Sequence, residues 1–500
     1  MLARLLFSSL LIASQIRAQH ITFLQTQNDT WNSTFELTSQ QLVNVNFSDT
    51  QATNLEIAVN FERSNWALGS ATQDDFYKAP ANTSSLPAGS VIKVQYFVNT
   101  TSFALPPNTA LSRLSYTTKN LLNDTIPASA YILWPYLPLT YPNLSSPRPG
   151  TNSSKFPVVA WAHGSSGVFA ECGPSNLRNL ESQYSAPYEL ALSGYVVIGP
   201  DYQGLGTNQS FDGSEIAHPY LVGSAAADDL FYAVQAAQSA FAARLSKEFV
   251  IMGHSQGGSA AWASAIRQHN TPVDGYLGSI AASPSTNLSG LITALGQALP
   301  PLLPMLGTQA IKALQPNFNI SRLLTAEGQS RYQLAKDISM CNSAAGELLA
   351  DFPTSDRGAL LHPNWTTVPE VADFFGATAG PGTLPISGPL LVLQGTSDLV
   401  VPYQFTDAAV AQTCAINNGR GVHYAKFAGV THVPVLYASR RIWLDFLTNR
   451  FSTVGNVTTS RTCVTVNHTS LPFPVENYQR ELGHRLELNT QSYQQGRLGF

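Results

Sequence analysis

Short runs of hydrophobic residues recur through the middle of the chain, and each is followed by a loop and a stretch of helical character. These runs lie at residues 158–162, 195–198, 249–252 and 389–393. Runs of this kind are typical of parallel strands that helices cover on both faces. The pattern therefore predicts an α/β fold with a mostly parallel sheet flanked by helices, whose site lies in the loops at the carboxyl ends of the strands.

The first part of the chain has a different pattern. Residues 19–90 are rich in Asn, Thr and Ser, and residues 42–47 and 55–61 alternate between polar and hydrophobic side chains, as half-buried strands do. We therefore expect an N-terminal β-rich extension over residues 19–90. Strand-like segments at 91–97 and 129–134 then begin the core.

A long region without strand-like runs interrupts the core. Leu- and Ala-rich segments broken by prolines predict a helical cap, or lid, inserted over residues 283–385. The core then comprises residues 91–282 and 386–450, and residues 451–500 form a C-terminal tail. Helices of the cap are predicted at residues 288–299, 309–314, 322–340 and 343–352.

The N-terminus has the features of a secretory signal peptide. Arg4 precedes a mainly apolar run at residues 5–13, and Ala18 is a small residue suited to cleavage. We assign residues 1–18 to a signal peptide and expect a secreted, extracellular protein. Prolines break the other apolar stretch, residues 288–306, so no transmembrane anchor is expected.

Charged residues are scarce. They make up 12% of the 500 residues, about half the usual share, and 27 basic against 31 acidic residues give a net charge of -4. A chain with no basic excess is a poor candidate for binding nucleic acid. Glycans solubilise a surface without charge, and fourteen Asn-x-Ser/Thr signals are present. The candidate glycosylation sites are Asn28, Asn32, Asn46, Asn82, Asn99, Asn123, Asn143, Asn152, Asn208, Asn287, Asn319, Asn364, Asn456 and Asn467.

The four cysteines are Cys172, Cys341, Cys414 and Cys463, and no two form a Cys-x-x-Cys pair. This spacing gives no support to a zinc or redox motif, and no metal or cofactor is predicted. In an oxidising compartment, two disulfides are expected, and three pairings are open.

The clearest chemical motif is Gly253-His254-Ser255-Gln256-Gly257. A hydrophobic run precedes it, and residues 259–266 can form a helix after it, which is the strand–turn–helix context of a nucleophile elbow. Glycines make room for such a tight connection, and the turn presents the serine hydroxyl at the edge of the sheet. We predict that Ser255 is a nucleophile; the alternative is an ordinary serine in a Gly-rich turn.

A nucleophilic serine needs a base and a carboxylate that orients the base, and in this architecture the acid precedes the histidine in the chain. Asp398 is the predicted acid, because it lies in a tight loop just after the run at 389–393. The alternative role for Asp398 is to cap a turn or helix. Weaker candidates for the acid are Asp228, Asp229 and Asp407.

His432 is the predicted base. It lies in a loop between a predicted strand at 422–427 and a predicted helix at 435–447, and it follows Asp398 by 34 residues. His163 and His254 do not fit the chain order, so we interpret them as structural. The weaker candidates after the acid are His423, His468 and His484.

An oxyanion hole has to stabilise the tetrahedral intermediate of such a reaction. One donor is expected to be the backbone N–H of Gln256, directly after the nucleophile. The second is expected in the loop Gly164-Ser165-Ser166, where small residues let backbone N–H groups approach a substrate. A simple glycine turn is the alternative interpretation of this loop.

Several loop motifs accompany the elbow in this part of the chain. They are Trp161-Ala-His-Gly-Ser-Ser-Gly167, Cys172-Gly-Pro-Ser175, Gly194-Tyr-Val-Val-Ile-Gly-Pro-Asp-Tyr-Gln-Gly-Leu-Gly206 and His218-Pro-Tyr-Leu221. Together they resemble the fungal secretory lipases of the lipase A type, over roughly residues 75–465. The resemblance implies an α/β-hydrolase fold with an inserted helical cap.

The resemblance also has consequences for individual residues. It implies a triad of Ser255, Asp398 and His432, and it implies the disulfides Cys172–Cys341 and Cys414–Cys463. This sequence departs from the family at residues 19–75, which are longer than expected. It also departs at Ser165-Ser166, where some members carry an acidic residue.

We therefore expect a secreted serine carboxylic-ester hydrolase, a lipase or esterase, that forms an acyl-serine intermediate. Its partner is an ester or lipid substrate, which a lipase meets at a lipid–water interface. The Leu-rich start of the cap at 288–306 either lines an acyl-chain site or forms a buried helical face. The same machinery also serves acyltransferases and serine peptidases, and the scaffold can serve a non-catalytic binding protein.

Overall fold

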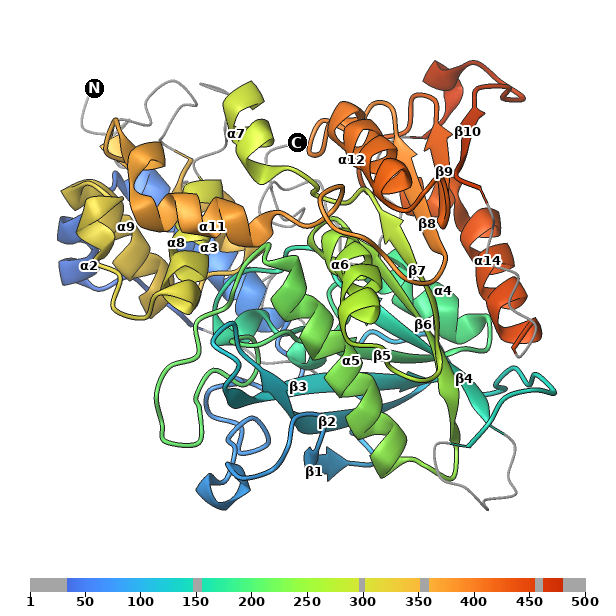
Figure 1. The fold of residues 1–500 in the computed structure, drawn as a ribbon. Helices are drawn as coiled ribbons and strands as arrows, with labels where there is room; N and C mark the ends of the chain where they lie inside the picture. Colours follow the sequence, from blue (N-terminus) through green and yellow to red (C-terminus); the bar gives the residue numbers. More distant parts are fainter. Residues whose placement is uncertain (1–33, 147–154, 296–301, 351–358, 455–461, 480–500) are drawn as a thin grey trace, which may run out of the picture.

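In the described part of the chain, one ten-stranded mixed sheet forms the centre of the protein, with the strand order β1-β2-β3-β5-β4-β6-β7-β8-β9-β10 (Figure 1). The structure is a computed structural model, and it describes residues 34–146, 155–295, 302–350, 359–454 and 462–479. The strands β4 to β10 run parallel to one another. At one edge of the sheet, β1, β2 and β3 pair antiparallel, and β3 also pairs antiparallel with β5. Their bounds are β1 (Val91–Gln95), β2 (Ala110–Lys119), β3 (Thr125–Trp134), β4 (Phe156–Ala162), β5 (Val196–Pro200), β6 (Leu245–His254), β7 (Tyr276–Ala282), β8 (Leu390–Gly395), β9 (Val422–Phe427) and β10 (Val464–His468).

The central strands are hydrophobic on both faces because helices cover both. In β4, Val158 and Ala160 belong to one core cluster, whereas Val159 and Trp161 belong to a second cluster. Successive side chains of a strand point to opposite faces, so the two clusters lie on opposite sides of the sheet. The continuous apolar runs of the sequence are thus explained by burial on both sides.

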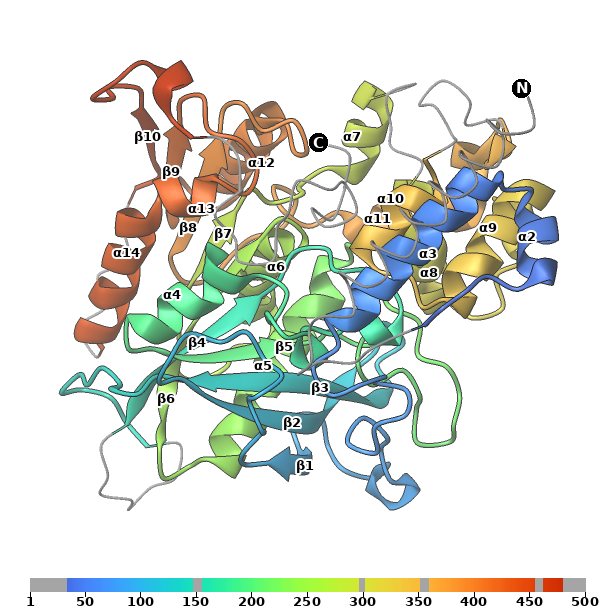
Figure 2. The same ribbon diagram turned by 180° about the vertical axis from the view of Figure 1, so that it is seen from behind.

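Figures 1 and 2 show the two helical layers. The helices α5 (Gly223–Ala240) and α6 (Gln256–Asn270) lie on one face, and α4 (Pro187–Leu192) and α14 (Arg440–Ser452) lie on the other. The short α13 (Val435–Ala438) precedes α14, and α12 (Tyr403–Ile416) packs against β8 and β9. The predicted mostly parallel α/β architecture is confirmed.

Helices between β7 and β8 form the predicted cap beside the sheet (Figure 1). They are α7 (Leu288–Leu295), α8 (Leu302–Leu314), α9 (Ala326–Asp337), α10 (Asn342–Leu348) and α11 (Pro369–Thr378). The helix predicted at 322–340 is shorter in the structure, because the Thr325 side chain caps α9 by accepting a hydrogen bond from the N–H of Gly328. Residues 296–299 and 351–352 of two predicted helices lie outside the described residues.

The N-terminal segment is helical, so the prediction of a β-rich extension over 19–90 is wrong where it can be compared. Residues 42–47 and 55–61, predicted as strands, fall mainly in α2 (Ser39–Val45) and α3 (Asp49–Ser64). Residues 19–33 lie outside the described residues.

Capping explains why these polar sequences form helices. Thr38 before α2 and Ser48 before α3 each form a capping box with a glutamine three residues later, Gln41 and Gln51. Each hydroxyl accepts a hydrogen bond from the glutamine N–H, and each glutamine side chain accepts one from the N–H of the cap residue. These bonds satisfy backbone groups that a helix start leaves unpaired, and the alternating pattern alone did not reveal them.

The N-terminal helices pack onto the cap, and both figures show α2 and α3 beside α8 and α9 (Figures 1 and 2). The Glu62 carboxylate of α3 accepts hydrogen bonds from the N–H groups of Cys341 and Ala344, at 3.0 and 2.8 Å, at the start of α10. Buried Arg331 of α9 donates to the carbonyl of Val45 in α2 at 3.2 Å. Residues 34–64 thus form an extension of the cap.

Disulfides join Cys172 to Cys341 and Cys414 to Cys463, the pairing that the family resemblance implies. The first bond links the loop after β4 to the start of α10 in the cap. The second links α12 to the tail, whose strand β10 extends the sheet by pairing with β9. The sequence pattern of the tail did not predict this strand.

Most of the candidate glycosylation sites are accessible. Of the sequon asparagines within the described residues, Asn208 is half-buried and the others are exposed, whereas Asn28, Asn32, Asn152 and Asn456 lie outside those residues. The predicted signal peptide, residues 1–18, also lies outside them. None of the helices in the described part of the chain combines the length and hydrophobicity that a bilayer span requires.

Candidate active site

The elbow motif forms a sharp turn between β6 and α6. Ser255 lies between the last residue of β6 and the first residue of α6, with φ 57° and ψ −119°. A positive φ at a non-glycine residue is strained and is typical of functional turns. The flanking glycines are required, because a Cβ at Gly253 would collide with the carbonyl of Gly257, and one at Gly257 with that of Ala162.

Asp398 and His432 form a hydrogen-bonded pair at neighbouring strand ends. Asp398 follows β8 and His432 follows β9, and the distance from His432 Nδ1 to Asp398 Oδ2 is 2.8 Å. The N–H groups of Val400 and Val401 donate to the other carboxylate oxygen, both at 2.9 Å. These bonds fix the carboxylate so that the imidazole is held with its Nε2 atom available.

The electrostatics keep Asp398 ionised. Its side chain is buried, and burial alone would raise the pKa of the carboxyl group. The charge and hydrogen bond of His432, with the N–H of Val401, outweigh that effect, so the net pKa of Asp398 is lowered. An ionised acid of this kind can stabilise an imidazolium that forms during a reaction.

The His254 side chain connects His432 to the elbow. Its Nε2 atom lies 3.0 Å from the carbonyl oxygen of His432, and the two rings are 4.6 Å apart between centroids. Ser283, after β7, also donates to this carbonyl, at 3.4 Å. His254 directly precedes Ser255 in the chain, so these contacts hold the loop of His432 beside the turn that carries Ser255.

The loop Gly164-Ser165-Ser166 lies against the elbow, since a Cβ built at Gly164 would be 3.7 Å from the Cβ of Ser255. The Ser165 hydroxyl bonds to the Tyr220 hydroxyl at 2.9 Å, and the Ser165 carbonyl accepts from Asn342 of the cap at 2.7 Å. The Ser166 hydroxyl is buried and has no hydrogen-bond partner among the described residues. Gln256, at the first position of α6, is also buried.

The weaker acid candidates have other partners. Asp407 pairs with Lys426 at 3.1 Å and accepts a hydrogen bond from Tyr424 at 2.8 Å. Asp228 pairs with Arg267. Asp229 is buried and bonds to the hydroxyl of Thr118 at 2.7 Å.

The other histidines are also accounted for within the described residues. His163 contacts the carbonyl oxygens of Gly164 and Asp201 through its two ring nitrogens, at 2.7 and 3.3 Å. His423 lies within β9, and the ring of His468 stacks on Phe427 at 4.8 Å. His484 lies outside the described residues.

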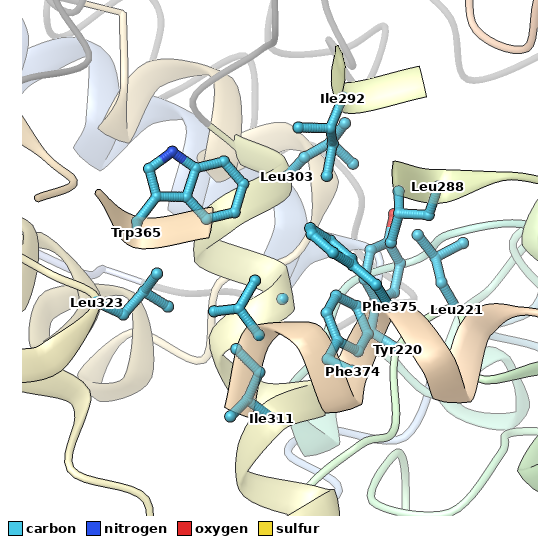
Figure 3. Close-up of a pocket in the computed structure, with 12 residues that line it drawn as sticks. Tyr220, Leu221, Leu288, Ile292, Leu303, Ile311, Leu323, Trp365, Phe374 and Phe375 are labelled. Atoms are coloured by element: carbon cyan, nitrogen blue, oxygen red, sulfur yellow. The ribbon is translucent and has the colours of Figure 1, made fainter. Parts of the chain in front are cut away.

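A hydrophobic pocket lies between the cap and the core (Figure 3). Tyr220, whose hydroxyl contacts Ser165, forms part of its wall and so connects it to the elbow region. Most of the lining residues carry no signal in the sequence, whereas the leucines of 288–306 are candidates for an acyl-chain site there. The lining residues are Tyr220, Leu221, Leu288, Ile292, Leu303, Gly307, Ile311, Leu323, Trp365, Val371, Phe374 and Phe375.

The described residues contain no group of three or more His, Cys, Asp or Glu side chains arranged to hold a metal ion. The elbow region brings together the side chains and backbone groups described above. They offer a strained serine, a histidine–carboxylate pair and backbone N–H groups at a helix start.

The sheet order, the elbow between β6 and α6, and the helical layers define an α/β-hydrolase fold. Residues 179–459, more than half of the chain, match the family described as secretory lipase, and the chain belongs to this family. A search of curated proteins found no match.

Solved structures show the same fold. The closed state of Candida antarctica lipase A has a TM-score of 0.60 and 16% identity, over 79% of this chain and 89% of that one. The rice cell wall degrading esterase LipA from Xanthomonas oryzae has a TM-score of 0.53 and 17% identity, over 74% of this chain and 98% of that one. At these identities, the similarity shows the fold.

Proposed function

We propose that this protein is a secreted serine hydrolase of carboxylic esters, with Ser255 as nucleophile, His432 as base and Asp398 as the orienting acid. The observation that carries the proposal is the 2.8 Å pair of His432 and Asp398 beside an elbow that holds Ser255 at φ 57°. Membership of the secretory lipase family supports a carboxylic ester as the substrate.

In the proposed first step, His432 removes the proton from the Ser255 hydroxyl as its oxygen attacks the ester carbonyl. Asp398 accepts the Nδ1–H of His432, which leaves Nε2 to take the proton, and its negative charge stabilises the imidazolium. The protonated His432 then returns the proton to the leaving alkoxide, which departs as an alcohol. Water activated by His432 hydrolyses the resulting acyl-serine.

The developing oxyanion needs donors that are already in place. The backbone N–H of Gln256 is the first proposed donor, because it lies at the start of α6 and next to Ser255. The loop Gly164-Ser165-Ser166 is the proposed source of the second, supported by the proximity of Gly164 to the Cβ of Ser255. The unpartnered hydroxyl of Ser166 is a further candidate within this loop.

The pocket under the cap supports an acyl chain as the apolar part of the substrate. Its side chains are almost entirely aliphatic or aromatic, and the Tyr220 hydroxyl, one of the few polar groups among them, is engaged with Ser165. Burying methylene groups there is favourable by about 0.8 kcal/mol each. We therefore place long-chain esters among the preferred substrates.

Secretion is supported by the signal-like residues 1–18, two disulfides and exposed sequons. Disulfides persist in oxidising compartments, where glycosylation signals are also used. Family membership agrees with export.

Hydrolysis of nitrophenyl esters from acetyl to palmitoyl tests the proposal. We expect Ser255→Ala to lower kcat by several orders of magnitude, as loss of a triad nucleophile does, while Ser264→Ala on the same helix stays near wild type. A chain-length optimum at long esters would support the assigned pocket.

Other outcomes would replace the proposal. Equal hydrolysis by wild type and Ser255→Ala would remove Ser255 from the mechanism. Acyl transfer to an added alcohol that exceeds hydrolysis would indicate an acyltransferase, and cleavage of amides without esters would indicate a peptidase. Absence of all these activities, with retained ligand binding, would indicate a binding protein.

A further inference from the structure

His218 contacts the residue that follows the nucleophile. It lies in the loop before α5, is 1% exposed, and places its Nε2 atom 3.1 Å from the side-chain Nε2 of Gln256. Its Nδ1 atom lies 2.9 Å from the carbonyl oxygen of Gln203. A buried ring thus connects the loop after β5 to the first residue of α6.

The donors and acceptors of this contact can be assigned from its partners. The Gln203 carbonyl can only accept, so His218 Nδ1 carries the proton and donates. Burial lowers the pKa of His218 to about 4, so the ring stays neutral above that pH. His218 Nε2 is then an acceptor, and the Gln256 amide nitrogen donates to it.

The other end of this contact is anchored in the core. The N–H of Gln203 donates to the buried Asp229 carboxylate at 2.9 Å, and Thr118 of β2 donates to the same carboxylate at 2.7 Å. These bonds satisfy the buried carboxylate of Asp229, which is one of the weaker candidates for the acid in the sequence. Through Gln203, they fix the position of His218.

A stack of three rings connects His218 to the loop of Gly164. His218 stacks on Tyr202 at 6.0 Å between centroids, and Tyr202 stacks on His163 at 4.2 Å. The Tyr202 hydroxyl donates to the His163 carbonyl at 3.0 Å. His163 directly precedes Gly164, so the stack ends beside the proposed second donor segment.

Tyr220 makes a parallel connection from the same loop. Its hydroxyl bonds to the Ser165 hydroxyl at 2.9 Å, and its side chain is only 3% exposed. Residues 218 and 220 therefore contact both sides of the proposed oxyanion hole, Gln256 on one side and Ser165 on the other.

We propose that the His218-Pro-Tyr220 segment sets the geometry of the oxyanion hole, with His218 as the positioning residue for Gln256. The proposal rests on the proposed function, since it needs the N–H of Gln256 to be a donor. His218 acts through Gln256 and does not touch the reacting atoms. The expected consequence is stabilisation of the transition state with little effect on binding of the ground-state ester.

A matched pair of substitutions separates the two contacts of His218. His218→Asn keeps an amide nitrogen near the Nδ1 position, facing Gln203, but removes the acceptor for Gln256. His218→Gln supplies an amide oxygen near the Nε2 position and keeps that acceptor. Loss of a whole oxyanion donor costs about 10²–10³ in kcat, so we expect His218→Asn to lower kcat about 10- to 100-fold and His218→Gln less than about fivefold.

The readouts distinguish positioning from a general effect on the fold. For His218→Asn, KM for a nitrophenyl ester should stay within about threefold of the wild-type value. A boronic acid inhibitor forms an adduct that places an oxygen in the oxyanion hole, so its affinity should fall in parallel with kcat. The stoichiometry of labelling by a nitrophenyl phosphonate should remain one per chain. Gln256→Met keeps the backbone N–H and should cause the same loss, with no further loss in the double variant.

The outcomes keep this proposal distinct from the proposed function. An active wild type with an inactive Ser255→Ala, but with His218→Asn and Gln256→Met both at wild-type kcat, would overturn the positioning role alone. Additive losses in the double variant, or a loss confined to KM, would overturn it too. If His218→Asn does not fold, Gln256→Met decides in the same way. Failure of the proposed function would appear earlier, as a wild type that hydrolyses no ester.

Discussion

The Nε2 atom of His254 lies 3.0 Å from the main-chain carbonyl of His432, so the residue before Ser255 holds the backbone of the proposed base. A carbonyl only accepts, so His254 Nε2 must carry a proton. This contact sets the position of the His432 loop relative to the elbow without involving the His432 ring nitrogens.

Removing that contact should lower the rate without abolishing it. We expect His254→Phe, which keeps a ring but no donor, to reduce kcat about 10- to 100-fold, because a small displacement of a general base costs this much. Steady-state kinetics against a nitrophenyl ester would measure the loss. An unchanged kcat would show that Ser283, the other donor to this carbonyl, is sufficient.

The two serines of the proposed oxyanion loop, Ser165 and Ser166, should differ in their effect on kcat. The Ser166 hydroxyl is buried without a partner among the described residues, whereas the Ser165 hydroxyl is engaged with Tyr220. We expect Ser166→Ala to lower kcat about 10- to 100-fold and Ser165→Ala about threefold, like Tyr220→Phe. Equal kcat values for wild type and Ser166→Ala would exclude the Ser166 hydroxyl as the second oxyanion donor. A backbone N–H of the loop would then remain as the candidate.

The pocket assignment predicts a change in chain-length preference. Gly307 lines the pocket, and an added Cβ there would contact only Phe374 within 4 Å, at 3.5 Å. Gly307→Phe should fill the space and lower kcat/KM for palmitoyl esters by at least about tenfold, with acetyl esters unaffected. Gly376→Phe on α11 is the matched control, because nothing lies within 4 Å of a Cβ there. Parallel loss for short and long esters would remove the pocket from acyl binding.

The two disulfides should differ in their effect on activity. Removing either should lower the free energy of unfolding by about 2–5 kcal/mol. Only the double variant of Cys172 and Cys341 to Ser should also lower kcat at temperatures where it stays folded, because Cys341 pairs with Gly167 of the oxyanion loop region through a β-bridge. Denaturant unfolding and kinetics of both double variants would test this. A similar kcat loss for the Cys414 and Cys463 variant would point to a general effect.

Stability should depend on pH through His218. Burial lowers its pKa to about 4 in the folded state, below the ordinary value of 6.5. The unfolded chain therefore binds a proton between these values that the folded chain does not, so this contribution to stability is present above pH 6.5 and is lost as pH falls toward 4. The advantage of wild type over His218→Asn should shrink by up to about 1.4 kcal/mol per pH unit in that window. Urea unfolding at several pH values would measure it, and a constant difference would contradict it.

The parts of the fold that repeat a simple pattern could be predicted from the sequence. Residues 158–162 and 249–252 read as buried strands because they are hydrophobic on both faces, and the structure contains β4 and β6 there. The elbow could also be predicted from the sequence, because its flanking glycines mark a tight turn. The structure shows why glycine is needed there: a Cβ at these positions would collide with the backbone of Ala162 or Gly257.

Features that depend on contacts between distant residues were not predictable. Residues 42–47 and 55–61 alternate between hydrophobic and polar side chains as strands do. Capping by Thr38 and Ser48, with packing on the cap, nevertheless makes them helical. The strand β10 forms by pairing with β9, and the sequence of the tail alone does not predict this pairing. The motif that contains His218 is one of those that carry the family resemblance. Its contact with Gln256 joins residues 38 positions apart in the sequence, so only the structure could reveal it.

The most direct measurement of the central claim is phosphonate labelling followed by peptide mapping. We predict that a nitrophenyl phosphonate adds one group per chain, on Ser255. We also predict that His432→Ala and Asp398→Asn slow the labelling by orders of magnitude, while the control Asp407→Asn does not. Labelling of another residue, or an active wild type that takes no label, would contradict the assignment of Ser255 as the nucleophile.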